Sequence, residues 1–446
     1  MKQKLGLVFT SILLTVTTAC QAGGSGEAAS KEKPKSKEGK TVVTLSLKTP
    51  KPYYEAAVKK FKEQHPDIDL QIQSFKQPGE KWGAGDLEKY VKTTNTALLS
   101  GKGADLIEVT DLPVAKNVNK ELLLDMNPML EQDQTLNKSQ LQTNVLNALR
   151  VNGALYSMPA GFFLRAFVGD GDALKRADAK FDDKSWNWKQ FEVTARQLVQ
   201  KTASGKDRLY ALENDPPEVI LQEWVVDSYG EFVDRATRKA KFDTPPFADM
   251  LRQIKKMYDD KIMTAEPADN GKHLFHSARL FSPADWIEET YGQFSNPKLL
   301  QKPHPEGKSG GIRILPSAEL AIQAQSAVKE EAWKFVAFLL SEEAQSLPDR
   351  EGFSLLTSVN EKKLGEIQSQ VKSGTYKLAS GKAVQVPDED FVQFKQFLQS
   401  ADRYEELDIK VLSIVYEESE AFFSGQKSAE EVAKLIQNRT TTYLNE

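Results

Sequence analysis

The feature that most constrains the fold is a regular alternation of strand-like and helix-like segments between residues 41 and 109. Residues 41–47 form a short β-rich run, and residues 54–61 repeat apolar side chains at the i, i+3, i+4, i+7 spacing of one helix face. Residues 68–72 alternate apolar and polar side chains, residues 87–98 carry a second helix face, and residues 104–109 end the series. The order strand, helix, strand, helix, strand predicts a parallel sheet with helices on its faces, because parallel neighbours need crossover connections.

The ends of the first and third predicted strands are the places where a ligand site is expected. In open α/β sheets, ligands bind outside the carboxyl ends of the strands. The segments that follow Leu47 and Val109 read KTPKPYY and TDLP. We therefore look first at these two segments for binding residues.

The N-terminal segment predicts export and lipidation. Residues 5–19 are apolar and follow two lysines, and they are shorter than the roughly 20 residues that span a bilayer. The small residues before Cys20 resemble the lipobox of bacterial lipoproteins, although Thr17 stands where leucine is usual. We expect a signal peptide at 1–19, a lipidated Cys20 and a flexible polar tether at 20–40. The alternative is an ordinary signal peptide, with Cys20 incidental.

Cysteine usage and charge limit the classes of protein further. Cys20 is the single cysteine of the chain, so the body has no disulfide and depends on its hydrophobic core. The 446 residues are enough for two domains of ordinary size. The formal net charge is −4, and the lysine-rich first 40 residues leave the body more acidic than the whole chain. Nucleic acid is therefore not an expected partner.

Several segments, in order along the chain, resemble the family 1 extracellular solute-binding proteins, the maltose-binding-protein-like lipoproteins of ABC importers. The resemblance begins in the region up to Val109 and continues through NGALYSMPAGF at 152–162 and SWNWKQF at 185–191. It extends to the C-terminus through KFDTPPFADMLRQIKKMYDD, GGIRILPSAELAIQAQSAVKEEAWKFVAFLLSEEAQ and SGQKSAEEVAKLI. Each motif is weak alone, because helix faces and capping boxes, such as those predicted at Asn187–Gln190 and Ser428–Glu431, are common, but the ordered set covers some 400 residues.

The resemblance implies a fold and a function. The expected fold is α/β, with two lobes that are each a mainly parallel sheet flanked by helices, and the chain crosses between them three times. Lobe one is expected at 41–151 and 272–340, and lobe two at 152–271 and 341–446. The implied function is capture of a carbohydrate in the cleft between lobes, closure by hinge bending, and delivery to the permease subunits of an ABC importer. The expected protein is a monomer at the extracellular face of the membrane or in the periplasm, without cofactor or metal.

Loop aromatics and strand-end carboxylates are the candidate site residues, because a sugar needs flat aromatic platforms and fixed hydrogen-bonding groups. Trp286 matches a tryptophan that commonly faces ligand in the family, and the alternative is a packing role. Asp111 follows the third strand, where relatives hold ligand hydroxyls, and the alternative is a turn or cap. Glu288 offers a carboxylate near Trp286.

Four further aromatic residues are candidates on weaker grounds. Phe162 and Phe163 follow the proposed first crossing, with core packing as the alternative. Trp82 lies in the glycine-rich segment QPGEKWGAGD, where a large aromatic lacks an obvious core partner. The helical spacing around Trp224 is compatible with a position in the core and with a position in the cleft.

One departure from the family pattern bears on the ligand. Many relatives read Leu-Tyr-Tyr-Asn shortly after the Gly-x-x-Tyr-x-x-Pro stretch, whereas residues 166–170 read AFVGD here. The usual tyrosine hydroxyls are absent, so the identity of the sugar stays open.

An enzyme is the main alternative class. Asp285, Glu288 and Glu289 offer carboxylates of the kind that a glycosidase uses, but a sequence does not show their separation. His273 and His276 share an i, i+3 spacing without a third metal ligand, so we expect a solvated pair. A secreted carbohydrate-active enzyme and a receptor for a peptide or other non-sugar solute therefore stand as alternatives.

Overall fold

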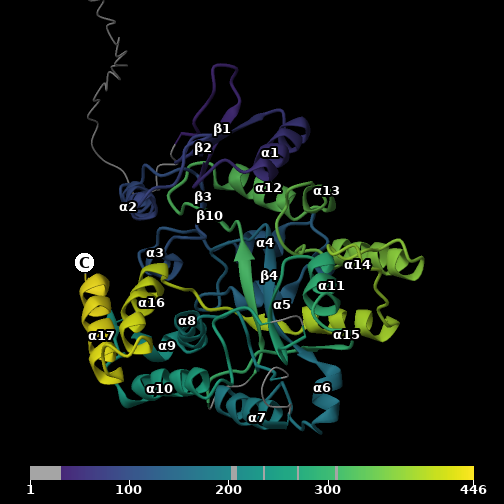
Figure 1. Cartoon of the computed structure of the whole chain (residues 1–446). Helices are drawn as coiled ribbons and strands as arrows, with labels where there is room; N and C mark the ends of the chain where they lie inside the picture. The colour runs from purple at the N-terminus through teal and green to yellow at the C-terminus, as the bar shows by residue number, and fades with distance from the viewer. Residues whose placement is uncertain (1–31, 202–207, 235–236, 269–270, 307–309, 446) are drawn as a thin grey trace, which may run out of the picture. The chain divides into compact units, whose positions relative to one another are not determined.

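The strand–helix alternation predicted for residues 41–109 is present in the structure. The computed structural model describes residues 32–201, 208–234, 237–268, 271–306 and 310–445. The first five elements follow the predicted order (Figure 1): β1 (Thr41–Leu47), α1 (Pro52–Gln64), β2 (Ile68–Ser74), α2 (Asp86–Leu99) and β3 (Leu106–Glu108). The expected signal peptide and Cys20 lie outside the described residues, so the fold below is that of Lys33–Glu446.

The first sheet contains the predicted parallel strands and one added strand. Its order is β10-β3-β1-β2, with β10 at Leu320–Ile322. β1 runs parallel to β2 and to β3, whereas β10 is antiparallel to β3. Alternate residues of β1 are fully buried, as the period of a strand with one face on a core requires. The carboxyl ends of β1 and β3 therefore meet at one edge of this sheet.

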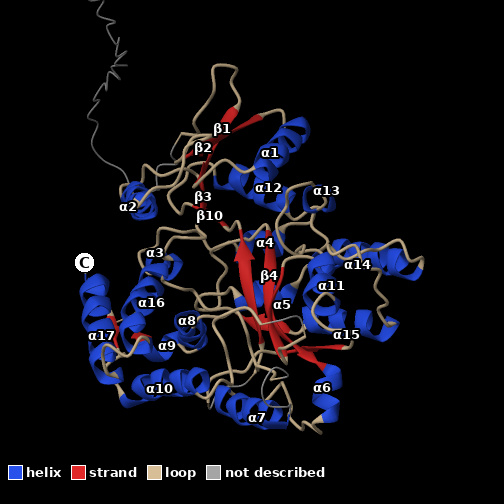
Figure 2. Cartoon of the chain, viewed as in Figure 1, coloured by secondary structure: helices blue, strands red, loops and turns tan. Residues whose placement is uncertain are grey.

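The second sheet is mostly antiparallel, which corrects the expectation of a mainly parallel sheet in each lobe. Its order is β11-β9-β4-β7, and β8 also pairs with β4. The long strand β4 is antiparallel to β7, β8 and β9, whereas β11 is parallel to β9. The strands are β4 (Gly161–Asp170), β7 (Phe275–Leu280), β8 (Pro297–Leu300), β9 (Ile312–Ser317) and β11 (Ala401–Arg403). Figure 2 shows the strands of both sheets in red.

The chain passes between the two sheets three times, as expected, but the second passage lies later than expected. Residues 272–317 were assigned to lobe one, yet β7, β8 and β9 all pair with β4 in the second sheet. The return to the first sheet occurs between Ser317 and Leu320, where Met158 pairs with Leu320 in an antiparallel bridge. Two antiparallel segments thus run side by side between the sheets at this point. The expected and observed boundaries differ because a strand can pair with a segment that is distant in the sequence, and the local pattern of residues does not reveal that partner.

Helices cover the two faces of the second sheet, and β4 contributes to a separate apolar core on each side. Leu164 and Val168 belong to a core shared with β1, whereas Phe167 belongs to a core beneath the C-terminal helices. The second core is built from α6 (Gly171–Arg176), α7 (Trp188–Lys201), α8 (Pro217–Asp227), α9 (Tyr229–Phe232), α10 (Pro245–Asp259), α16 (Ile409–Phe423) and α17 (Ala429–Asn445). The small hairpin of β5 (Val233–Asp234) and β6 (Lys239–Ala240) lies next to α9.

The shared core joins the two sheets. It contains buried side chains of β1, β4 and β7 together with α12 (Lys329–Leu339) and the helices between the sheets. The remaining elements are α3 (Val114–Val118), α4 (Asn127–Gln132), the 3-10 turn Lys138–Gln140, α5 (Thr143–Ala148), α11 (Pro283–Tyr291), α13 (Glu342–Gln345), α14 (Thr357–Lys372) and α15 (Asp388–Gln399). None of the helices in the described part of the chain has both the length and the apolar composition that crossing a bilayer requires.

The end of the expected tether packs on the body. Lys33 Nζ donates to Glu331 at 2.9 Å, and Lys35 forms an antiparallel bridge with Thr41. Residues 33–40 therefore add contacts to α12 and to the start of β1, where the sequence indicated only a polar tether. Backbone pairing explains the difference, because it does not depend on apolar side chains.

The predicted capping residues hold two helix starts. Gln190 N donates to Asn187 Oδ1 and Asn187 N donates to Gln190 Oε1, both at 2.9 Å, at the start of α7. Ser428 and Glu431 make the same reciprocal pair before α17, at 2.8 and 3.3 Å. Both capping boxes are confirmed, because their residues are close in sequence and need no tertiary contact.

Candidate functional site

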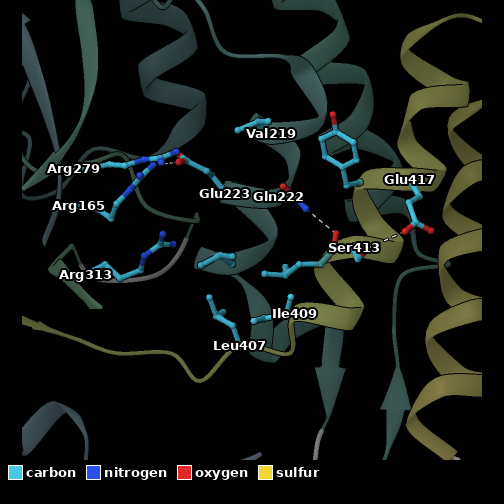
Figure 3. Close-up of a pocket in the computed structure, with 13 residues that line it drawn as sticks. Arg165, Val219, Gln222, Glu223, Arg279, Arg313, Leu407, Ile409, Ser413 and Glu417 are labelled. Carbon is cyan, nitrogen blue, oxygen red and sulfur yellow. Dashed lines mark hydrogen bonds and ion pairs between the residues drawn. The ribbon is translucent and has the colours of Figure 1, made fainter. Parts of the chain in front are cut away.

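A cavity with a volume of about 570 Å³ lies between the second sheet and two helices, α8 and α16. This volume is within the usual range of small-molecule sites, about 300–1,000 Å³. Figure 3 shows arginine side chains from the sheet on one side and residues of the two helices on the other. The lining residues are Arg165, Val219, Gln222, Glu223, Val226, Arg279, Arg313, Leu407, Ile409, Leu412, Ser413, Tyr416 and Glu417.

Helical periodicity explains why α8 and α16 line the cavity. On α8 the lining positions 219, 222, 223 and 226 follow the i, i+3, i+4, i+7 rule, and the opposite face carries buried Leu221 and Trp224. On α16 the lining positions 409, 412, 413, 416 and 417 share one face, while Val411 and Ile414 are buried. Gln222 Nε2 donates to the Leu412 carbonyl at 2.8 Å and thereby fixes the two helices to each other.

Strand pairing brings the arginines of the cavity together. Arg165 on β4 is the direct antiparallel partner of Arg279 on β7. Arg313 on β9 lies next to the pair Leu164 and Ile314 that joins β9 to β4. Arg165 is buried and Arg279 is exposed, so the guanidinium groups reach the cavity from different depths.

Partly buried carboxylates compensate part of this positive charge. Glu223 accepts hydrogen bonds from both Arg165 and Lys302, and Arg313 contacts Asp227 at 3.2 Å. Burial, with the neighbouring arginines, lowers the pKa of Arg165 to about 10, and burial also holds the pKa of Lys302 below its usual value. In the described structure, the Nε atoms of Arg165 and Arg313 are buried without a hydrogen-bond partner.

A second polar group forms where β1 and β3 end, as expected from the parallel sheet. Lys48 forms an ion pair with Asp111, and its ammonium group lies 5.8 Å from the centre of the Trp82 ring. Trp82 is 40% exposed and stacks on Phe75, with ring centroids 6.1 Å apart. The structure thus brings together two of the candidate residues, Asp111 and Trp82. Ala115 N, four residues after Asp111, donates to Glu406 at 3.1 Å, beside Leu407 of the cavity lining.

The tryptophan expected to face ligand is buried in a core. Trp286 is 2% exposed and stacks on Phe394, with ring centroids 4.4 Å apart and planes at 7°. A loop was expected around Trp286, but the segment forms the helix α11. This helix starts with Pro283, directly after the N-cap residue Ser282. The proline favoured the helix start, because its fixed φ suits the first turn. Trp286 therefore has the packing role that stood as the alternative.

The other aromatic candidates also lie outside the cavity lining. Phe162 is fully buried against Phe353, and Phe163 packs edge-on against the exposed Phe281. Trp224 is buried and stacks on Trp188, with ring centroids 4.7 Å apart. Sequence periodicity shows that these residues lie on the apolar face of an element, but it does not show whether that face packs in the core or lines a cleft.

The carboxylates and histidines considered for catalysis make structural contacts within the chain. The Glu288 carboxylate accepts a hydrogen bond from Ala379 N at 2.8 Å. The Ser282 hydroxyl donates to the Asp285 carboxylate and accepts from Asp285 N. His276 contacts Glu289 at 2.6 Å. His273 is buried, which corrects the expected solvated pair, because its ring packs against Phe294. Over the described ranges, no group of three or more potential ligands is arranged to hold a metal ion.

The arginines that line the cavity are not among the site residues predicted from the sequence. The sequence contained a signal for Arg165, because it is the one charged residue in the interior of the apolar strand GFFLRAFVGD, which otherwise has only Asp170 at its end. A charged residue in a strand buried on both faces needs a partner or a function. The residue lies directly before the AFVGD segment whose departure from the family pattern was recognised.

Comparison with known proteins identifies the family. A model of the family described as bacterial extracellular solute-binding protein matches residues 46–346, more than half of the chain. The chain belongs to this family. Solved structures match this solute-binding protein over almost its whole length. An ABC substrate-binding protein from Listeria monocytogenes in complex with cycloalternan is 16% identical, with a TM-score of 0.55, and the match covers 91% of this chain and 99% of that one.

Two further structures support the same fold. A family 1 extracellular solute-binding protein from Alicyclobacillus acidocaldarius is 17% identical, with a TM-score of 0.58, and the match covers 91% of this chain and 99% of that one. The sugar-binding protein MalE from Xanthomonas citri is 16% identical, with a TM-score of 0.57, and the match covers 91% of this chain and 98% of that one. At these identities the likeness concerns the fold, and it agrees with the expected two-lobe α/β architecture of the solute-binding protein.

Proposed function

We propose that this solute-binding protein captures a carbohydrate, an oligosaccharide or a sugar derivative, and delivers it to the membrane subunits of an ABC importer. The observation that carries the proposal is the cavity of about 570 Å³ in a chain of the solute-binding family. Its lining combines hydrogen-bonding groups of Gln222, Ser413 and Tyr416 with apolar side chains such as Leu412. A sugar presents the same combination of hydroxyl groups and apolar C–H faces.

The named ligands of related folds support the carbohydrate class. Solved relatives include the cycloalternan complex from Listeria monocytogenes and a cyclic maltosyl-maltose binding protein from Arthrobacter globiformis. The two polar groups, one at the ends of β1 and β3 and one in the cavity, would contact opposite sides of a solute after closure of the lobes. Asp111 and Trp82 would then belong to the binding site.

The proposed protein binds its solute without changing it, is a monomer, and is attached to the extracellular face of the membrane through lipid on Cys20. Cell fractionation of the Cys20→Ala variant tests the attachment. The variant is expected in the soluble fraction and the unchanged chain in the membrane fraction. Equal distribution of the two chains would contradict lipidation.

A thermal-shift screen of the full chain with neutral and acidic oligosaccharides tests the proposed function. A ligand that binds only the folded state raises the melting temperature in a saturable way. Mass spectrometry of the ligand after incubation must show it unaltered, because a carbohydrate-active enzyme would consume it. If no oligosaccharide shifts the melting temperature, the carbohydrate assignment is wrong. Peptides in the same screen test the non-sugar alternative.

A further inference from the structure

Four arginines form a row across the second sheet. Arg279 on β7 pairs directly with Arg165 on β4, and Arg313 on β9 pairs directly with Arg403 on β11. The pair Leu164 and Ile314 joins β4 to β9, and one step further in this antiparallel register brings Arg165 opposite Arg313. Each of four neighbouring strands therefore contributes one arginine to the same row.

Such a row is electrostatically unfavourable by itself. Neighbouring strands are about 4.8 Å apart, and like charges directly opposite each other destabilise a sheet. Arginine does not relieve the repulsion by losing its proton under ordinary conditions. The row therefore requires negative charge close to it.

The chain's own carboxylates supply only part of that charge. Glu223 is shared between Arg165 and the buried Lys302, and Asp227 contacts Arg313 through its carboxylate and Arg403 through its carbonyl. Burial raises the pKa of Asp215, a carboxyl that interacts electrostatically with Lys302 and Arg165. Glu417 of the cavity lining is already paired with Arg439.

Arg279 and two buried nitrogen atoms remain available to a ligand. In the described structure, no hydrogen bond or ion pair reaches the side chain of Arg279, which lines the cavity. The Nε atoms of Arg165 and Arg313 are buried without a partner, and Arg165 is only 7% exposed. An unpaired buried donor is costly, and an anion in the cavity would satisfy it. Guanidinium groups match a carboxylate in particular, because both are planar and form two parallel hydrogen bonds.

We propose that the solute is an acidic sugar and that its carboxylate binds at the arginine row, with Arg279 as its first contact. This inference rests on the proposed carbohydrate function and names the substrate class.

Isothermal titration of the full chain with two disaccharides of the same skeleton tests the proposal. Digalacturonate carries carboxylates and galactobiose does not. Digalacturonate is expected to bind at least 10-fold more tightly, and its affinity is expected to fall as salt is added. Galactose 6-phosphate in a third titration distinguishes a carboxylate site from a general anion site: tighter binding of the phosphate would overturn the carboxylate assignment.

Variants at an exposed position provide the control. Arg279→Gln is expected to weaken digalacturonate binding about 10- to 100-fold and to leave galactobiose binding within about 2-fold. Arg252→Gln, on α10 and outside the cavity, is expected to change neither affinity. Binding of galactobiose but not digalacturonate would overturn the acidic-sugar inference and leave the proposed function intact. Absence of binding by any sugar in the wider screen would overturn both.

Discussion

Arg165 and Arg279 stand directly opposite each other on neighbouring antiparallel strands, and within the described part of the chain only Arg165 of the two has a carboxylate partner, Glu223. Two guanidinium groups at this spacing repel each other, and a third cation, Lys302, shares the same carboxylate. The local structure therefore depends strongly on Glu223, whereas Arg279 is left for contact with a solute.

Replacement of Glu223 is expected to destabilise the fold. Glu223→Gln leaves Arg165 and Lys302 buried without a counter-charge, at a cost of roughly 3–5 kcal/mol in the free energy of unfolding. Urea denaturation of the unliganded chain measures this cost. Glu417→Gln in the same cavity is the matched control and is expected to cost less than about 1 kcal/mol, because its pair with Arg439 is exposed. Equal effects of the two variants would contradict the assigned role of Glu223.

Trp286 is expected to contribute to stability and not to solute binding. Trp286→Ala removes a side chain that is stacked on Phe394 in the shared core, so a loss of about 3–5 kcal/mol in unfolding free energy is expected. The affinity of the fraction that remains folded is expected to be unchanged in titrations below the lowered melting temperature. Loss of affinity without loss of stability would instead support the ligand-facing role.

Trp82 is expected to behave in the opposite way. Its ring is 40% exposed, so Trp82→Ala removes little buried surface and is expected to change unfolding free energy by less than about 1 kcal/mol. If the ring stacks on the captured sugar, affinity falls about 3- to 10-fold. Val193→Ala on α7, also exposed, controls for removal of a surface apolar group. An unchanged affinity in Trp82→Ala would exclude the ring from the site.

The stability of the chain is expected to carry a pH-dependent contribution from Glu319. Burial, with smaller effects from Glu406 and Asp111, raises the pKa of this carboxyl from 4.5 to about 7. The folded state then binds a proton that the unfolded state has released, so the contribution to stability falls as pH rises from 4.5 to about 7, and it is constant above that range. The difference amounts to roughly 3 kcal/mol.

Glu319→Gln tests this contribution. The variant keeps an acceptor for the Ser157 hydroxyl, which donates to Glu319 at 2.8 Å, but does not ionise. Urea denaturation at pH 5 and pH 8 measures the free energy of unfolding. Between these two pH values it is expected to decrease less for the variant than for the unchanged chain, so that the variant is the more stable of the two at pH 8. An identical pH dependence for both chains would contradict the raised pKa.

Local signals in the sequence predicted the local structure well. The alternation up to Val109 predicted β1, α1, β2, α2 and β3, because each element leaves its own periodicity in a few neighbouring residues. The capping boxes at Asn187 and Ser428 were predicted for the same reason. The polar residues at the ends of β1 and β3, among them Asp111, follow from the rule for parallel sheets.

Non-local pairing could not be predicted in the same way. The pattern of residues 275–280 indicates a strand but does not say that this strand pairs with β4, and the lobe boundary at 272 followed from analogy. Trp286 and Phe394, whose rings stack, are 108 positions apart in the sequence, so the burial of Trp286 leaves no local trace. The arginine row arises from the register of four strands and is invisible in any one of them.

A crystal structure of the chain with the oligosaccharide that most raises its melting temperature would show where the solute binds. The sugar is expected to occupy the cavity between the second sheet and helices α8 and α16, within hydrogen-bond distance of Gln222 and with a carboxylate at Arg279. A sugar bound elsewhere on the chain, with this cavity empty, would contradict this expectation.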